Sequence, residues 1–220
     1  MASPAEDPDT APAAARVVLE RTFQSRSPEA TEALGEALGR RLGPGAVVAL
    51  VGELGTGKTC LVRGLARGLG VEGPVTSPSF TLMHQYPGPV ELRHFDAWME
   101  GRERAFLEGG GAEWLYGEGV AVIEWAGRVQ DWLPAPRLEL LIEHRGPAER
   151  LLRVRLLAPA GDGTEPREAD PHGLRGALEG LRGGPELAEG LPADSPGAGV
   201  NRGPGGALTG ADLPRTPDRP

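Results

Sequence analysis

The stretch AVVALVGELGTGKTCLVRGLARGLG, residues Ala46 to Gly70, begins as an apolar run, turns glycine-rich and then takes on helical spacing. The apolar run shows no polar alternation, which is typical of a strand buried on both faces of a parallel sheet. GELGTGKT (52–59) matches the phosphate-loop pattern G-x-x-x-x-G-K-[ST] in the strand–loop–helix context that the pattern requires. The stretch therefore predicts an α/β fold that binds the phosphates of a nucleotide.

Each residue type in this loop has a physical reason. Gly52, Gly55 and Gly57 let the backbone curl with its N–H groups inward, and the helix N-terminus adds a partial positive charge. Lys58 is expected to bring an ammonium to the β- and γ-phosphates, and the Thr59 hydroxyl to bind Mg²⁺. Lys58 is the only lysine of the chain, whose other basic residues are all arginine. Because a planar guanidinium does not fit such a cradle, the single lysine supports the phosphate-loop prediction.

Composition sets the expected limits of the folded domain. The 220 residues include 34 Gly and 22 Pro, and from Pro159 onward there is no Phe, Trp or Tyr. Such a segment buries too little apolar surface to offset the entropy of ordering. We therefore expect disordered segments over 1–15 and 159–220, on either side of one folded domain over 16–158. Leu174, Leu178 and Leu181 could form a short amphipathic turn in GLRGALEGLRG (173–183) that docks on the domain or on a partner, but its interior glycines favour the unfolded state.

Charge and cysteine content exclude several classes of protein. The formal net charge of −8 argues against a stand-alone nucleic-acid binder, which carries a basic face, so contact with RNA would need a partner. The N-terminus lacks the basic and apolar regions of a signal peptide, and no apolar stretch is long enough to span a bilayer. The single cysteine, Cys60, rules out an internal disulfide and indicates a reducing compartment, so we expect a cytoplasmic protein. Taken alone, Cys60 is typical of a small buried apolar residue on a helix.

Periodicity and end signals predict the remaining elements. A strand is expected over 16–23, followed by a helix with Ser27 as N-cap and Pro28 as its first residue. Short helices broken by glycines are expected over 101–116. The other expected strands are FTLMHQY (80–86), VELRHF (90–95), VAVIEW (120–125), RLELLIEH (137–144) and RLLRVRLLA (150–158), the last two as an antiparallel hairpin. The predicted fold class is α/β: a P-loop NTPase-type domain with a mixed, centrally parallel sheet flanked by helices.

Two acidic residues stand at strand ends, where phosphate-loop proteins keep the groups that bind Mg²⁺ and position the nucleophile. Asp96 follows VELRHF, and Glu124 lies near the end of VAVIEW. Either acid could instead cap a helix or lie in a solvated turn. The segment VTSPSF (75–80) has the position of a switch loop near the γ-phosphate, although its hydroxyls also suit an ordinary turn. We interpret His94 and Trp125, beside the two acids, as structural residues.

The motifs GELGTGKT, VTSPSFTL, HFD and VIEW, in this order and at this spacing, resemble the TsaE (also called YjeE) family of bacterial P-loop ATPases. The resemblance covers 17–158. It implies an enzyme that hydrolyses ATP with Mg²⁺ in the synthesis of tRNA threonylcarbamoyladenosine (t6A), together with two partners, TsaB and TsaD. The family's ATPase does not itself transfer the threonylcarbamoyl group to adenosine 37 of tRNAs that read ANN codons. It is required for repeated turnover of the partner complex and meets tRNA only through it.

The resemblance also assigns roles to residues. It implies a phosphate cradle over 55–59, Mg²⁺ ligands at Thr59 and Glu124, and catalytic roles for Lys58 and for Asp96, which acts on the attacking water. The residues that it implies as nucleotide contacts are Gly52, Gly55, Thr56, Gly57, Lys58, Thr59, Cys60, Ser27, Pro28, Gly127 and Arg150.

The chain departs from the family pattern after Asp96. The family usually continues Leu-Tyr-Arg, whereas this chain has Ala97-Trp98-Met99 and lacks the arginine. Arg102 or Arg104 is close enough in sequence to take its place.

Two other functions stay open. Small-molecule kinases share this type of P-loop, but they need an acceptor pocket and usually a lid with several arginines, for which GRERAF (101–106) is a short candidate. A nucleotide-gated binding module, in which ATP only orders the switch loop, is the second alternative.

Overall fold

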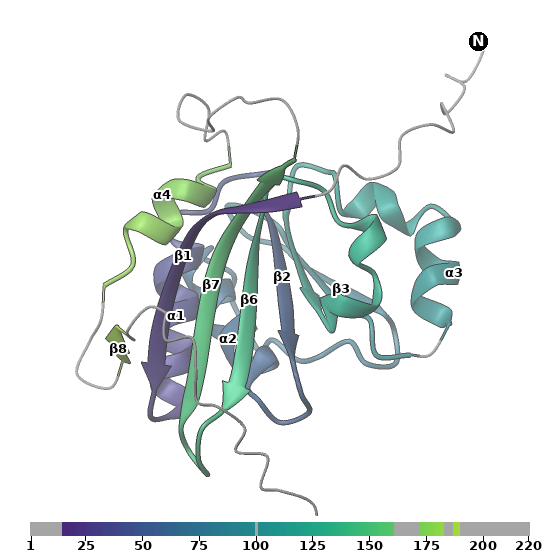
Figure 1. Cartoon of the computed structure of the whole chain (residues 1–220). Helices are drawn as coiled ribbons and strands as arrows, with labels where there is room; N and C mark the ends of the chain where they lie inside the picture. Colours follow the sequence, from purple (N-terminus) through teal and green to yellow (C-terminus); the bar gives the residue numbers. More distant parts are fainter. Residues whose placement is uncertain (1–14, 100, 161–171, 183–186, 190–220) are drawn as a thin grey trace, which may run out of the picture.

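A mixed sheet runs through the protein (Figure 1). The structure, a computed structural model, describes residues 15–99, 101–160, 172–182 and 187–189. Within these ranges the sheet has eight strands in the order β3-β4-β5-β2-β6-β7-β1-β8. The strands are β1 (Ala15–Ser25), β2 (Val47–Gly52), β3 (Met83–Tyr86), β4 (Leu92–Asp96), β5 (Val120–Glu124), β6 (Arg137–His144), β7 (Arg150–Pro159) and β8 (Leu187–Glu189).

The centre of the sheet is parallel and its edges are antiparallel. β4, β5, β2 and β6 pair in parallel, whereas β3 pairs antiparallel with β4, β7 with β6, and β1 with β7. This arrangement confirms the predicted fold class and the predicted β6–β7 hairpin. It also places the carboxyl ends of β2, β4 and β5 at one edge of the sheet, where phosphate-loop proteins build their site.

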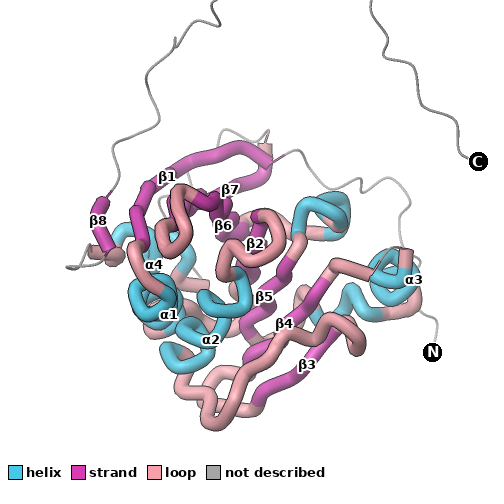
Figure 2. Tube along the Cα trace, turned by 90° about the horizontal axis from the view of Figure 1, so that it is seen from below, coloured by secondary structure: helices cyan, strands magenta, loops and turns pink. Residues whose placement is uncertain are grey.

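Helices cover both faces of the central strands. α1 (Pro28–Gly39) and α2 (Lys58–Gly68) lie side by side on one face, and α3 (Arg102–Glu108) lies on the other (Figure 2). Alternate residues of β2 face the two layers: Val48 and Leu50 pack with α1 and α2, and Val47 and Ala49 with the α3 layer. The apolar run thus forms a strand buried on both faces, as predicted. The α3 layer also contains short 3₁₀ helices at Gly111–Trp114, Ala126–Arg128 and Gln130–Trp132.

Helix α1 begins as its sequence predicts. The Ser27 hydroxyl accepts a hydrogen bond from the Ala30 N–H at 3.1 Å, and Pro28 is the first helical residue. α1 and α2 approach closely through glycines: a Cβ added at Gly64 would overlap the carbonyl oxygen of Glu32. None of the helices in the described ranges is long and apolar enough to cross a membrane.

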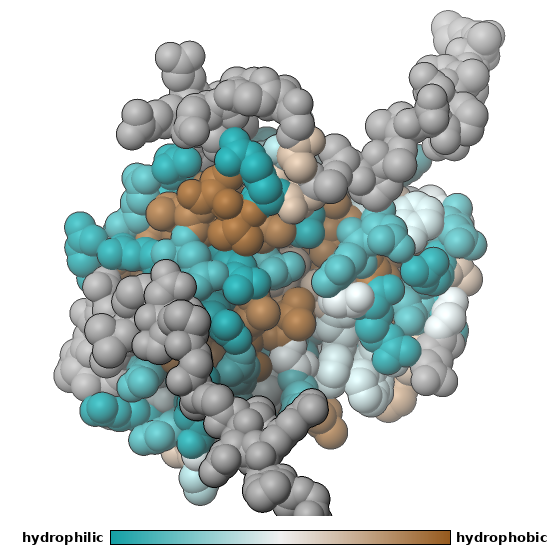
Figure 3. Space-filling view, viewed as in Figure 1, coloured by the Kyte–Doolittle hydropathy of each residue, from teal (hydrophilic) through white to brown (hydrophobic). Residues whose placement is uncertain are grey.

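The antiparallel half of the sheet, formed by β6, β7 and β1, leaves one face to solvent. In Figure 3 this face shows hydrophilic and apolar residues intermixed. Arg155 lies between Glu20 and Glu139 from the neighbouring strands, and Arg153 pairs with Glu143. The alternation of inward apolar and outward charged residues is typical of an antiparallel sheet with one solvated face.

A helix beyond the predicted domain boundary belongs to the folded core. α4 (Leu174–Glu179) packs against α1 and β7, and Arg21 of β1 donates to the carbonyl oxygens of Glu179 and Leu181 at its end. Four residues join the α1–α2 core and are at most 2% exposed: Leu174, Ala177, Leu178 and Leu181.

The boundary predicted at 158 is therefore wrong for residues 172–182. The physical reason is local, because four apolar residues at helical spacing bury enough surface to hold one short helix, although the composition around them is poor. β8 pairs with β1 over Phe23–Ser25. The rest of the predicted disordered segments (1–14, 161–171, 183–186 and 190–220) lies outside the described residues.

Candidate nucleotide and metal site

The phosphate loop joins the end of β2 to the start of α2. Gly55 and Gly57 have φ angles of 74° and 102°, in the left-handed region that favours glycine. A Cβ at Gly52 would lie 2.5 Å from the carbonyl oxygen of Ile142, so the close approach of β6 also requires glycine there. The Thr56 hydroxyl donates to the Glu53 carbonyl at 2.9 Å and closes the loop. The predicted roles of these glycines in shaping the backbone thus agree with the geometry.

Lys58 is buried at the base of the loop. Its Nζ donates to the carbonyl oxygens of Gly52 and Glu53, each at 2.9 Å, and lies 3.6 Å from the ring centroid of Trp125. Burial lowers the pKa of Lys58, and the negative charges of Glu124 and Asp96 oppose this shift. The ammonium is therefore held between backbone carbonyls and an aromatic face, beside the two predicted acids.

Trp125 has a larger part in this site than its sequence context indicates. Its φ of 58° lies in the left-handed region, which costs free energy for a bulky residue and is typical of functional sites. The centroid of its ring lies 4.2 Å from the centroid of the Trp98 ring, and the ring also contacts the ammonium of Lys58. Sequence reasoning treated it as a structural residue because a lone Trp after a strand has no pattern that predicts such a contact.

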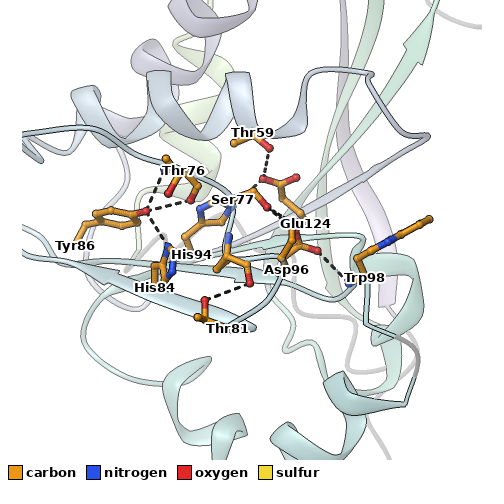
Figure 4. Close-up of polar contacts among 12 residues, drawn as sticks. Thr59, Thr76, Ser77, Thr81, His84, Tyr86, His94, Asp96, Trp98 and Glu124 are labelled. Atoms are coloured by element: carbon orange, nitrogen blue, oxygen red, sulfur yellow. Dashed lines mark hydrogen bonds and ion pairs between the residues drawn. The ribbon is translucent and has the colours of Figure 1, made fainter.

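Three residues from three elements meet at the carboxylate of Glu124. Glu124, at the end of β5, is buried, and its Oε1 accepts a hydrogen bond from the Thr59 hydroxyl at 2.8 Å (Figure 4). The same oxygen lies 2.9 Å from Nε2 of His94 on β4. The structure thus brings together Thr59 and Glu124, the pair predicted to bind Mg²⁺. It adds His94, which sequence reasoning set aside as structural.

Asp96 lies at the end of β4, in register with Glu124 on β5. Its Oδ2 accepts hydrogen bonds from the hydroxyls of Ser77 at 2.6 Å and Ser79 at 2.9 Å, and its Oδ1 accepts one from the Trp98 N–H at 3.0 Å. Figure 4 shows the Asp96 carboxylate beside that of Glu124. The predicted switch loop therefore contacts the predicted acid directly.

The switch loop has a second attachment through Tyr86. The Tyr86 hydroxyl donates to the Thr76 carbonyl at 3.1 Å and lies 3.2 Å from the Thr76 N–H (Figure 4). The loop ends in a turn around Pro78, whose carbonyl accepts the Leu82 N–H at 2.8 Å. Leu82 has a φ of 66°, so the strand predicted from Phe80 begins only at Met83. Phe80, which follows Ser79 in the chain, is left 83% exposed.

A cavity of about 450 Å³ adjoins the phosphate loop on the side of α1. Arg150 spans its edge, donating to the carbonyl oxygens of Thr56 at 3.0 Å and Gly55 at 3.2 Å. Burial raises the pKa of the Cys60 thiol to about 11, and its Sγ lies 3.2 Å from the Pro28 carbonyl. The cavity is lined by Ser27, Pro28, Thr31, Gly55, Thr56, Gly57, Cys60, Arg63, Pro147, Ala148 and Arg150.

The structure therefore brings four of the five predicted contacts outside the loop to one cavity: Ser27, Pro28, Cys60 and Arg150. Gly127 is not among the residues that line it and lies in the 3₁₀ helix after Trp125.

The resemblance predicts an arginine shortly after Asp96, and this chain has Met99 at that position. Arg104 pairs with Asp131 on the surface, at 3.4 Å. The guanidinium that lies over Trp98 is that of Arg128, 5.7 Å from the ring centroid. Trp98 also donates its backbone N–H to Asp96, so Trp98 contacts both Arg128 and the predicted acid.

Comparison with known proteins identifies the family. The family model "Threonylcarbamoyl adenosine biosynthesis protein TsaE" matches residues 25–152, which include every residue of the site described above. The chain belongs to the TsaE family.

Members of the TsaE family from distant bacteria are similar to it. The TsaE protein of Treponema pallidum is 46% identical over 110 residues, which are 50% of this chain and 82% of that protein. The Bacillus subtilis TsaE is 38% identical over 129 residues, covering 58% and 80% of the two chains. The Streptomyces coelicolor TsaE is 38% identical over 148 residues, covering 65% and 98%.

A solved structure agrees with the TsaE assignment. The crystal structure of Bacillus subtilis YdiB matches with a TM-score of 0.54 and 32% sequence identity. The match covers 64% of this chain and 88% of that one. Helix α4 and strand β8 lie outside the residues that the family model matches.

Proposed function

We propose that this TsaE-family protein is a Mg²⁺-dependent P-loop ATPase that works with TsaB-like and TsaD-like partners in the modification of adenosine 37 in tRNAs that read ANN codons. One observation carries the proposal: Lys58, Thr59, Asp96 and Glu124 converge from the phosphate loop and two adjacent parallel strands. A loop that only bound phosphate would not need two buried carboxylates beside it, because buried charges are costly unless they serve a partner.

Binding of ATP would use the phosphate loop and the adjoining cavity. A cavity of about 450 Å³ lies in the range of small-molecule sites, and its walls combine apolar groups with a few polar ones. The N–H groups between Gly55 and Thr59 and the start of α2 would hold the phosphates. Arg150, which bonds the loop's carbonyl oxygens, keeps the loop in shape next to that cavity.

The residues present fit a magnesium ion. Mg²⁺ prefers oxygen ligands and is usually held by one or two protein oxygens together with phosphates and water. The Thr59 hydroxyl and the Glu124 carboxylate supply such oxygens within 2.8 Å of each other. When bound, Mg²⁺ would neutralise charge on the β- and γ-phosphates.

Asp96 would position and deprotonate the attacking water. The hydroxyls of Ser77 and Ser79 hold its carboxylate in one orientation, and they belong to the switch loop. Lys58 would turn from the Gly52 and Glu53 carbonyls to the γ-phosphate and stabilise the charge that develops there. The Trp125 ring over Lys58 and the buried ends of β4 and β5 would limit the access of bulk water to the γ-phosphate.

The proposed place in t6A synthesis rests on family membership and on charge. A net charge of −8 argues for contact with tRNA through partners. The lone Cys60, buried as a free thiol, is compatible with the reducing cytoplasm, where we place the protein.

Phosphate release from ATP tests the proposal. The full chain is assayed with Mg²⁺, alone and with purified TsaB and TsaD proteins, next to Lys58→Ala. We expect release that needs Mg²⁺ and increases with the partners, and none from the variant. Transfer of the γ-phosphate to a small molecule instead of water would indicate a kinase. Binding of ATP without turnover under every condition would indicate a gated module.

A further inference from the structure

His94 has an environment that packing alone does not explain. It is fully buried on β4, between His84 on β3 and Val122 on β5. Its Nε2 lies 2.9 Å from Oε1 of Glu124, and its Nδ1 has no hydrogen-bond partner among the described residues. Burying a polar ring in the middle of a sheet costs free energy because the ring is removed from water, so it needs a compensating interaction. The only such interaction within the described ranges is the one with Glu124.

The geometry selects one form of the ring. A proton on Nδ1 would be buried without an acceptor, which is costly, whereas a proton on Nε2 meets a carboxylate oxygen. A proton on Nε2 therefore fits this geometry, and His94 donates to Glu124. A hydrogen bond to an ionised acceptor is about twice as strong as one between neutral groups.

Two donors fix the same carboxylate oxygen from different elements. Oε1 of Glu124 accepts from His94 on β4 and from the Thr59 hydroxyl at the start of α2. Oε2 has no hydrogen-bond partner within the described part of the chain. The two bonds thus restrain Oε1 from two elements, and Figure 4 shows the carboxylate beside Thr59.

We infer that His94 is a positioning residue for the metal site, and that its Nε2–H holds Glu124 in the orientation needed to bind Mg²⁺ together with Thr59. The inference rests on the proposed function, because it concerns the same metal site. Groups that hydrogen-bond a metal-binding side chain typically contribute about 10- to 100-fold to metal affinity or activity. His94 acts here through its hydrogen bond to the Glu124 carboxylate.

Matched substitutions separate this role from simple packing. In His94→Gln the amide nitrogen is as many bonds from Cβ as Nε2, so the variant keeps a donor toward Glu124. In His94→Asn the amide corresponds to Nδ1 and does not reach Glu124. His94→Leu keeps the volume and removes every donor. A packing role ranks the variants by shape, whereas a positioning role ranks them by the position of the donor.

The test is binding of a non-hydrolysable ATP analogue to the full chain, with Mg²⁺ and with EDTA, accompanied by thermal melts. We expect Mg²⁺ to strengthen binding to wild type and to His94→Gln by similar factors. In His94→Asn and His94→Leu we expect that gain to fall about 10- to 100-fold, while affinity in EDTA stays near wild type. If His94→Leu does not fold, the Gln and Asn variants carry the comparison.

Either of two results in the variants overturns the inference. One is a normal gain from Mg²⁺ in His94→Asn. The other is an equal loss of affinity with Mg²⁺ and with EDTA, which would make His94 a packing residue. If wild type itself gains nothing from Mg²⁺, the proposed metal site fails and the inference fails with it. A normal wild-type gain together with unaffected variants refutes the role of His94 alone.

Discussion

Leu178→Ala in α4 tests whether the helix beyond the predicted boundary stabilises the domain. Leu178 is fully buried in the core that α4 shares with α1 and β7. Replacing a buried leucine by alanine typically costs about 2–5 kcal/mol, through lost apolar burial and the cavity left behind. α4 has only six residues and can relax or detach, so its own docking free energy limits the loss. We therefore expect the lower end, about 2 kcal/mol.

For a chain of this size, 1 kcal/mol shifts the melting temperature by about 2–4 °C, so Leu178→Ala should lower it by about 4–8 °C. The matched control is Glu179→Ala in the same helix, whose side chain is 56% exposed and pairs with Arg175. A surface pair of this kind contributes about 0.3–0.5 kcal/mol, so the control should melt within about 2 °C of wild type.

Calorimetric melts of the full chain at neutral pH measure both variants. A Leu178→Ala protein that melts together with Glu179→Ala and wild type would refute the packing of α4. It would also restore the domain boundary at residue 158.

Three further predictions concern the site. Lys58→Arg should abolish ATP hydrolysis, because the guanidinium does not fit the space between the Gly52 and Glu53 carbonyls and the Trp125 ring; wild-type turnover would contradict the assignment of the phosphate loop. Asp96→Asn should leave ATP binding nearly intact and slow phosphate release by about 10²–10⁴-fold; equal loss of both would indicate a metal or structural role. Alkylation of Cys60 should be slow at neutral pH, accelerate toward pH 11 and be blocked by nucleotide. Because the pKa of the Cys60 thiol is higher in the folded than in the unfolded protein, the contribution of Cys60 to the free energy of unfolding should be lost as the pH rises from 9 to 11. Labelling that nucleotide does not affect would show that Cys60 does not line the nucleotide site.

The parts of the fold that sequence predicts well are those determined by local physics. The apolar run of β2, the glycines at positive φ and the Ser27–Pro28 start of α1 each follow from short-range constraints, and the structure has all of them. The sequence also predicts that Glu124 lies near Thr59, because parallel strands with a phosphate loop bring their carboxyl ends to one edge of the sheet.

The parts that were missed depend on register or on packing at a distance. The contact between His94 and Glu124 arises from the pairing of β4 with β5, and a lone histidine in a strand carries no pattern that predicts it. The turn that follows β5 is what brings the guanidinium of Arg128 over the Trp98 ring. α4 was not predicted, although Leu174, Leu178 and Leu181 stand at helical spacing, because the interior glycines of 173–183 and the composition of the 62 residues of 159–220 favoured an unfolded segment. That spacing was a usable signal.

Reconstituted tRNA modification tests the proposed function most directly. Unmodified tRNA that reads an ANN codon is incubated with a threonylcarbamoyl donor, ATP and limiting TsaB and TsaD proteins, with this protein, without it, or with its Asp96→Asn variant. We predict several t6A products per partner complex with the wild-type chain, and about one or fewer without it or with the variant, because the function we propose for ATP hydrolysis is to allow repeated turnover. Equal amounts of t6A in all three reactions, well above one per complex, would contradict the proposed function.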